Sequence, residues 1–531
     1  MDAPPSRDIE LEWQLDAQDL RPVLRWIEAA SANGAAPVEI GAGRTATHVD
    51  TYLDTRDRSL DRAGYSLRIR RAGRRAPVAT VKSLERGAAD PTGPLVRLEL
   101  EEAVEGLEPA TLSRAPGPVG ERIRALVGRR ALAPLFDVQT RRRVFPLTAA
   151  GKPSGELVLD DTAFREPGGR ILSRLRRVEL EAEPESRAAV EPLVESLRSA
   201  CGLQPALLSK YESGLAASGI PRTEPQTFGR TTISSADTIG EVALAVLRRN
   251  FTSMLAKEPG TRIGDDIEEL HAMRVATRRL RAALALFAAE LPAAAAELRA
   301  ELAWIGGTIG VVRDLDVQLE QLDGWIAALP DADREPLKRL RELLDGDRRQ
   351  ARAEMLAAFD SPRYARLVRR FGAMLRARSG ARRPPALGAA PELVERRHRA
   401  LRKAARRITP RAPADDYHRL RIAGKRFRYT LEFVADVYPG ATERLVRRMV
   451  GLQDVLGAHQ DADVAVGRLR ALAAERGTEL GPATVFAMGE VAERYQQSMP
   501  GLRSDARRQF VAVEGKEWKR LREALEAERP A

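Results

Sequence analysis

The sequence contains a single cysteine, Cys201, in 531 residues. One thiol excludes an internal disulfide and any zinc site built from several cysteines. Aromatic residues make up only 5% of the chain, which leaves few side chains to stack on nucleic-acid bases. No uninterrupted apolar run approaches the ~20 residues that cross a bilayer, and residues 1–8 lack the apolar segment of a secretory signal. These absences predict a cytoplasmic protein that does not bind membranes, and they disfavour nucleic acid as a binding partner.

A chain of this length is too long for one hydrophobic core and predicts several domains. Its net charge of +12 is unevenly distributed. Residues 231–531 hold 53 basic and 42 acidic side chains, whereas residues 1–230 hold 34 and 33. The basic excess therefore belongs to the C-terminal part, where we expect a polyanion to bind.

Two segments, residues 270–281 and 417–428, match without a gap at an offset of 147. Each carries a histidine followed by bases three, seven, eight and ten positions later. On a helix, positions 271, 274, 278 and 281 share a stripe about 80° wide, with apolar residues opposite. A single basic stripe is typical of a solvated surface, but a duplicated one favours anion binding. The candidate residues are His271, Arg274, Arg278, Arg279, Arg281, His418, Arg421, Lys425, Arg426 and Arg428.

The duplication continues at the same offset, because residues 310–317 and 457–464 share a Gly…Asp-x-Asp-Val pattern. A period of 147 residues is far longer than a solenoid repeat, so a whole helical domain has been duplicated. Two helical bundles facing each other would bring both basic stripes to one cleft.

The N-terminal part alternates charged and apolar residues with period two, which indicates strands. About eight such segments are present, at residues 8–15, 47–55, 66–71, 78–82, 95–102, 139–147, 156–161 and 177–183.

Both signs of charge appear on these strands. Carboxylates at Asp8, Glu10, Glu179 and Glu181 could hold a divalent cation through hard oxygen ligands. Basic side chains could hold phosphates, and the candidates are Arg68, Arg70, Lys82, Arg97, Arg141 and Arg143. The alternative is salt pairing across an exposed sheet. The charged side chains would line a lumen if the strands closed into a barrel with a polar interior.

An ordered set of short motifs resembles the CYTH family, also called the triphosphate tunnel metalloenzymes, over residues 6–215. The motifs are Ile9-Glu10-Leu11, Tyr52-x-Asp54-Thr55, Leu67-Arg68-Ile69-Arg70, Lys82, Arg97-x-Glu99, Leu159-Asp160, Val178-Glu179-Leu180-Glu181 and Ser209-Lys210-Tyr211. The resemblance implies an eight-stranded antiparallel β tunnel with flanking helices. It also implies Mg²⁺ or Mn²⁺ on the acidic residues, and inward bases, Lys210 among them, that hold a triphosphate for hydrolysis.

The first strand departs from the family pattern, Glu-x-Glu-x-Lys. Alignment on Ile-Glu-Leu makes Asp8 and Glu10 the acids and puts Glu12 where lysine belongs. The alternative register makes Glu10 and Glu12 the acids and leaves Gln14 in the lysine position. The lysine is absent in both. Under the first register Glu12 would put a negative charge near the polyanion, which a role as a further metal ligand could offset. Asp160 would position or deprotonate the attacking water.

The C-terminal part, residues 235–531, resembles the CHAD family through His271, His418, the basic stripes and the Asp-x-Asp elements. This resemblance implies an all-α domain of two pseudo-symmetric four-helix bundles that binds inorganic polyphosphate. The composition of residues 216–234 predicts a linker. The fold class is therefore α+β and multidomain.

The sequence as a whole predicts metal-dependent hydrolysis of inorganic triphosphate or a related polyphosphate by the tunnel. The helical domain would bind polyphosphate, which would place the protein in the cytoplasm with polyphosphate granules. The alternative is a non-catalytic polyphosphate-binding protein whose tunnel has lost activity, because the lysine of the first strand is missing.

Overall fold

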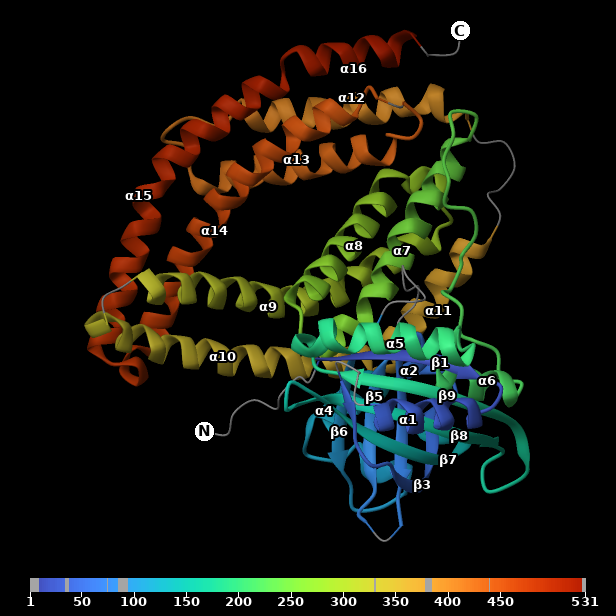
Figure 1. The fold of residues 1–531 in the computed structure, drawn as a ribbon. Helices are drawn as coiled ribbons and strands as arrows, with labels where there is room; N and C mark the ends of the chain where they lie inside the picture. Colours follow the sequence, from blue (N-terminus) through green and yellow to red (C-terminus); the bar gives the residue numbers. More distant parts are fainter. Residues whose placement is uncertain are drawn as a thin grey trace. The chain divides into compact units, whose positions relative to one another are not determined.

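The structure is a computed structural model that describes residues 9–33, 38–73, 75–84, 94–328, 331–377, 384–438 and 440–527. The chain divides into two compact units, Met1–Pro225 and Gln226–Ala531, which Figure 1 shows in sequence colours. Their boundary falls inside the linker predicted over residues 216–234. The backbone has no helix or strand between α6 (Lys210–Ala217) and α7 (Ile239–Ile263), and α6 includes the first two residues of the predicted linker.

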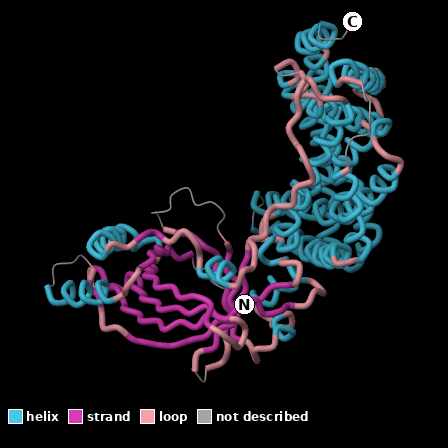
Figure 2. The backbone as a smooth tube through the Cα atoms, turned by 90° about the vertical axis from the view of Figure 1, so that its right-hand side faces the viewer, coloured by secondary structure: helices cyan, strands magenta, loops and turns pink. Residues whose placement is uncertain are grey.

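The first unit is a closed antiparallel barrel. Its strands are β1 (Ile9–Ala17), β3 (Arg44–Thr55), β4 (Tyr65–Arg71), β5 (Val78–Ser83), β6 (Leu95–Ala103), β7 (Leu132–Ala149), β8 (Lys152–Arg165) and β9 (Ile171–Ala182), with short β2 (Glu39–Ile40) and β10 (Gln204–Pro205) added at β7 and β1. The order is β1-β6-β5-β4-β3-β7-β8-β9, and β9 pairs again with β1. Figure 2 shows the strands curving round into one layer. The predicted eight-stranded antiparallel tunnel is confirmed.

Alternation along the strands separates an apolar outer face from a charged inner face. On β1, Leu11, Trp13 and Leu15 belong to a buried cluster, while Glu12 and Gln14 line the interior. Helices α1 (Arg21–Asn33) and α5 (Arg187–Cys201) supply the other side of that cluster. Short elements complete the unit: α2 (Ser59–Arg62), α3 (Pro109–Leu112), α4 (Pro118–Val127) and the 3₁₀ turn η1 (Pro184–Ser186).

Helix α6 packs against the barrel through Tyr211 and Leu215, which join Tyr52 and Phe136 in a second apolar cluster. The helix begins with a capping box in which the Ser209 hydroxyl accepts from the backbone N–H three residues on. Gly214 is required here, because a Cβ at this position would lie 2.1 Å from the Phe136 ring. This close approach holds Lys210 at the barrel interior.

The second unit is entirely helical and duplicated. Its first half is α7, α8 (Ile267–Leu286), the 3₁₀ turn η2 (Ala288–Glu290), α9 (Ala294–Ala328), α10 (Asp331–Phe359) and α11 (Pro362–Arg376). Its second half is α12 (Ala386–Ala405), α13 (Ala414–Phe433), α14 (Glu443–Leu480), α15 (Pro482–Val513) and α16 (Lys516–Ala527). Helices α7 and α12, and likewise α8 and α13, begin 147 residues apart, as the sequence repeat predicts.

Each half contains a ring of four packed helices, α7-α8-α9-α11 and α12-α13-α14-α16, so the two predicted four-helix bundles are confirmed. Helices α10 and α15 are additional, and each forms a long hairpin with the helix before it (Figure 1). The halves meet through equivalent helices, α7 with α12, α8 with α13 and α10 with α15, which is the pattern of a pseudo-twofold axis.

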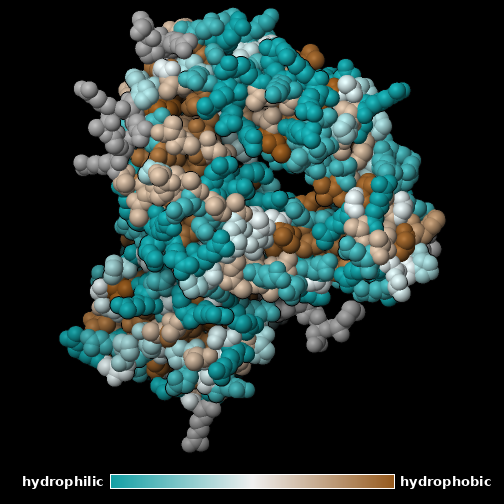
Figure 3. All heavy atoms as spheres, turned by 180° about the vertical axis from the view of Figure 1, so that it is seen from behind, coloured by the Kyte–Doolittle hydropathy of each residue, from teal (hydrophilic) through white to brown (hydrophobic). Residues whose placement is uncertain are grey.

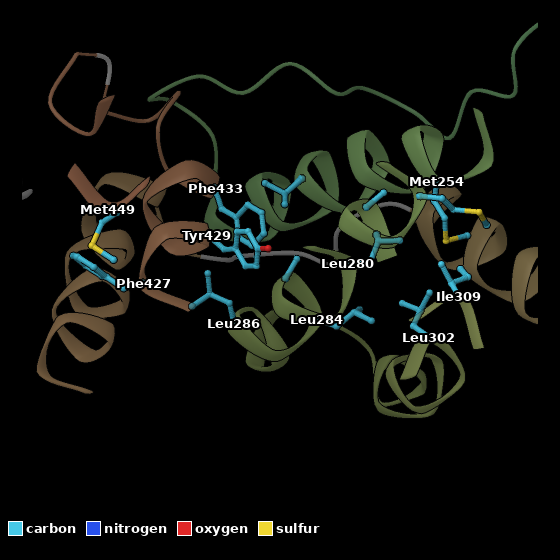
Figure 4. Close-up of a cluster of buried hydrophobic side chains, with 14 of the residues drawn as sticks. Met254, Leu280, Leu284, Leu286, Leu302, Ile309, Phe427, Tyr429, Phe433 and Met449 are labelled. Carbon is cyan, nitrogen blue, oxygen red and sulfur yellow. The ribbon is translucent and has the colours of Figure 1, made fainter. Parts of the chain in front are cut away.

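One apolar core runs through both bundles. Figure 4 shows part of it, where Tyr429 and Phe433 of α13 lie among leucines of α8 that include Leu284 and Leu286. Because these apolar residues define the inward face of α8 and α13, the basic stripe lies elsewhere on both helices. None of the described helices combines the length and the low charge that a bilayer-spanning helix needs.

Candidate functional site

The barrel interior holds a cavity of about 520 Å³, and its lining is mostly charged. Carboxylates and bases from opposite sides of the barrel share it. The acidic lining residues are Glu12, Glu99, Glu101, Glu179 and Glu181, and the basic ones are Arg68, Arg70, Lys82, Arg142 and Lys210.

Three carboxylates converge in this cavity. Glu12 lies opposite Glu181 in the β1–β9 register, and single oxygens of Glu12, Glu179 and Glu181 all lie within 4.8 Å of one another. Burial and the charge of Glu179 raise the pKa of Glu181 to about 7. Three convergent carboxylates whose negative charge is incompletely neutralised fit a hard divalent cation such as Mg²⁺ or Mn²⁺.

The position of Glu12 favours the alternative register of the first strand. Asp8 lies outside the described residues, and Glu10 is described only through its backbone, which pairs with Arg97 of β6. The structure therefore tests neither side chain as a metal ligand. Glu12 occupies the acidic cluster directly, and Gln14, two residues on, takes the place of the family lysine and donates to Glu12 Oε1 over 2.6 Å.

The predicted bases of β4 and β5 face the cavity and are already ion-paired. Arg68 Nη2 donates to Glu99 over 3.0 Å, and Lys82 Nζ lies 3.1 Å from Glu12 and 2.9 Å from Glu99. Arg70 Nε donates to Asp50 over 2.8 Å. The salt pairing considered as an alternative is thus present, but on the inner face. The Arg97 side chain lies outside the described part of the chain.

On β7 the structure places Arg142 in the cavity, whereas the sequence assigned its neighbours Arg141 and Arg143 to the phosphate site. Arg141 is exposed, and Arg143 lies 5.0 Å from the Phe145 ring. The alternation of side chains along β7 explains why Arg142 and not its neighbours enters the cavity. Phe145 belongs to the outer apolar cluster, so residues two apart from it share the outer face and Arg142 points inward.

Asp160 is completely buried and is not among the described residues that line the cavity. Its carboxylate accepts from Arg142 Nε and Nη2 over 3.0 and 2.8 Å and also binds Lys210. Lys210 Nζ lies 2.8 Å from Glu179 as well. These contacts give Asp160 a positioning role toward two cavity bases, and its action on water stays a prediction.

The helical unit holds a larger cavity, of about 830 Å³, lined by both basic stripes. Figure 3 shows an opening through this unit with hydrophilic side chains along part of its edge. The lining bases come from both halves of the repeat and are Arg274, Arg278, Arg281, Arg299, Arg313, Arg397, Arg421, Lys425 and Arg426. His271 also lines the cavity.

Three predicted residues are held elsewhere. Arg279 and Arg428 both pair with Glu432, and His418 Nδ1 contacts the Gln460 side chain. Three lining bases were missed: Arg299, Arg313 and Arg397. Arg313 adjoins the repeated Asp-x-Asp element and could have been found there, whereas the other two lie outside the repeated motifs.

The helical cavity carries an excess of positive charge. Burial, together with the charges of Arg278 and Arg421, lowers the pKa of Lys425 to about 7. Burial and Arg313 likewise lower the pKa of His271. Basic groups so close together that they lower one another's pKa indicate a site that attracts an anion.

Family models match both units. The CYTH domain model matches residues 30–213, and the CHAD domain model matches residues 245–470. The chain consists of a CYTH domain followed by a CHAD domain. No curated protein matches the sequence.

Solved structures similar to this chain fall on one domain or the other. The CHAD domain from the plant Ricinus communis is 28% identical, covers 57% of this chain and 97% of its own, and has a TM-score of 0.42. PptA from Streptomyces chartreusis is 21% identical, and the match covers 52% of this chain and 99% of PptA, with a TM-score of 0.43. A putative adenylyl cyclase from Hippeastrum with a dominant triphosphatase activity is 20% identical, and the match covers 39% of this chain and 95% of the cyclase, with a TM-score of 0.30.

The CYTH cavity should bind Mn²⁺ through its three glutamates, and Glu181→Gln should weaken that binding about tenfold or more, because it removes a charged oxygen ligand. Protons compete for Glu181, whose pKa is about 7, so wild-type affinity should fall as pH is lowered through 7. Isothermal titration with Mn²⁺ measures both effects.

Glu99→Gln is the matched control for this titration. It removes the same charge from the same cavity, but Glu99 lies outside the glutamate trio and is paired with Lys82 and Arg68. Equal loss of affinity in both variants would contradict the assignment of the metal site.

Proposed function

We propose that the CYTH domain hydrolyses inorganic triphosphate or a related polyphosphate with the help of Mg²⁺ or Mn²⁺. The observation that carries the proposal is the shared barrel cavity, in which three convergent glutamates face five bases. A metal and a phosphate chain can occupy such a cavity together, because each needs the opposite charge from the protein.

The cavity residues divide the work between metal and phosphates. A cation on Glu12, Glu179 and Glu181 would neutralise phosphoryl oxygens and make the phosphorus more open to attack by water. Arg68 and Arg70 would hold the phosphates. Arg68 has capacity to spare, because its Nε is buried without a hydrogen-bond partner among the described residues.

Phosphate release from tripolyphosphate in the presence of Mn²⁺ should be readily measured with the wild-type chain. Arg68→Ala should lower kcat/KM about a hundredfold, since one charge-stabilising donor typically contributes that much. Arg141→Ala is the matched control and should leave the rate unchanged, because Arg141 is exposed outside the cavity.

A non-catalytic barrel is the second candidate, and two contacts favour it. Gln14 stands in the lysine position, and Lys82 is held between Glu12 and Glu99. If the wild-type chain releases no phosphate with either Mg²⁺ or Mn²⁺, hydrolysis is refuted and the non-catalytic barrel is the remaining candidate.

We further propose that the CHAD domain binds inorganic polyphosphate in the helical cavity. Nine lining bases from both halves support this, with only Asp314 and Asp461 as acidic lining residues in the described part of the chain. A polyphosphate that neutralises these bases releases counterions, so affinity should fall steeply with salt.

Replacing Arg274, Arg278, Arg421 and Lys425 together by alanine should remove most polyphosphate binding and flatten its salt dependence. Fluorescence anisotropy of labelled long-chain polyphosphate with the full-length protein measures both. The control replaces four exposed bases away from the cavity, Arg366, Arg369, Arg396 and Arg399, by alanine. Equal binding by the cavity variant and the wild type would refute the cavity as the site.

A further inference from the structure

Two carboxylates lie among the bases of the CHAD cavity. Asp314 of α9 and Asp461 of α14 both line it, and they are the equivalent first aspartates of the duplicated Asp-x-Asp element. Each half of the repeat therefore places one acid inside its own basic surroundings. A cavity that only has to attract phosphate would gain nothing from either acid.

The two aspartates face the bases that a phosphate chain would need. Arg274 Nη1 donates to Asp314 Oδ1 over 2.8 Å. Burial raises the pKa of Asp461, the nearby charge of Asp314 adds to the rise, and Arg421 and Lys425 oppose it. Asp314 thus pairs directly with Arg274, and the charge of the equivalent Arg421 acts on Asp461.

The second aspartates of the same elements do something else. Asp316 is buried and pairs with Arg348 over 2.5 Å, away from the cavity lining. Asp463 also lies outside the lining, and its charge acts on His459. The residues three positions later, Val317 and Val464, also line the cavity, so Asp314 and Asp461 lie on the cavity face of their helices and the second aspartates do not.

We propose that Asp314 and Asp461 are internal competitors of the phosphate chain, which occupy the cavity bases when it is empty and limit how tightly it retains a polymer. The proposal rests on polyphosphate binding by this cavity. An incoming chain must replace the Asp314 carboxylate on Arg274 and then remain beside two negative charges. Both effects weaken retention and speed release, while the carboxylate keeps Arg274 oriented in the empty cavity.

The test uses the full chain with Asp314→Asn and Asp461→Asn combined. Binding of labelled long-chain polyphosphate should tighten about fivefold, mainly through slower dissociation, because two partly exposed charge interactions contribute roughly this much. The matched control, Glu320→Gln with Asp463→Asn, removes two charges from the same helices outside the cavity lining and should change affinity less than twofold.

A second variant, Asp314→Glu with Asp461→Glu, keeps both charges and should bind like the wild type. Unchanged or weaker binding by the asparagine variant would overturn the proposal, since the aspartates would then be neutral or helpful to binding. Equal tightening in the control would also overturn it, because net charge alone would explain the effect. Absence of polyphosphate binding by the wild type would instead refute the proposed function, and this inference with it.

Discussion

Incomplete charge compensation inside the two charged cavities is the constraint on which the rest of this structure depends. A buried charge is costly unless an opposite charge or a ligand neutralises it. In the CYTH barrel most inward bases have inward acids as partners, such as Arg70 with Asp50 and Arg142 with Glu179. Glu181 is compensated more weakly, because Arg142 Nη1 lies 3.9 Å from it, and its raised pKa marks a shortage of positive charge. In the CHAD cavity the imbalance has the opposite sign, as the lowered pKa of Lys425 shows.

The two folds meet this constraint by different means. The barrel buries its apolar outer face under α1 and α5, which frees the inner face for charge. The helical unit brings two copies of one basic stripe together by duplication, because α8 and α13 pack against each other near the pseudo-twofold axis. In both cases hydrophobic burial outside the cavity holds like charges close together, which they would not do alone.

The sequence predicted the elements whose periodicity is strong. Alternation gave the eight barrel strands, and the offset of 147 gave the paired bundles, since both patterns are set by which face of an element is buried. The sequence could not show which of the three consecutive arginines of β7 points into the barrel. Only the packing of Phe145 in the outer cluster fixes Arg142 as the inward residue. Arg397 was beyond reach for a similar reason, because it enters the cavity from a helix outside the repeated stripe.

The first strand shows how a missing residue can mislead. The absent family lysine suggested that Glu12 was a misplaced negative charge, yet Glu12 joins Glu179 and Glu181, and Lys82 of β5 brings an ammonium group 3.1 Å from it. The measurement that tests this account most directly is phosphate release from tripolyphosphate with Mn²⁺ by Glu12→Lys. Because the proposed metal site needs Glu12, the rate should fall about a hundredfold or more. A rate that rises tenfold or more would contradict the account and show that the missing lysine limits the activity of the barrel.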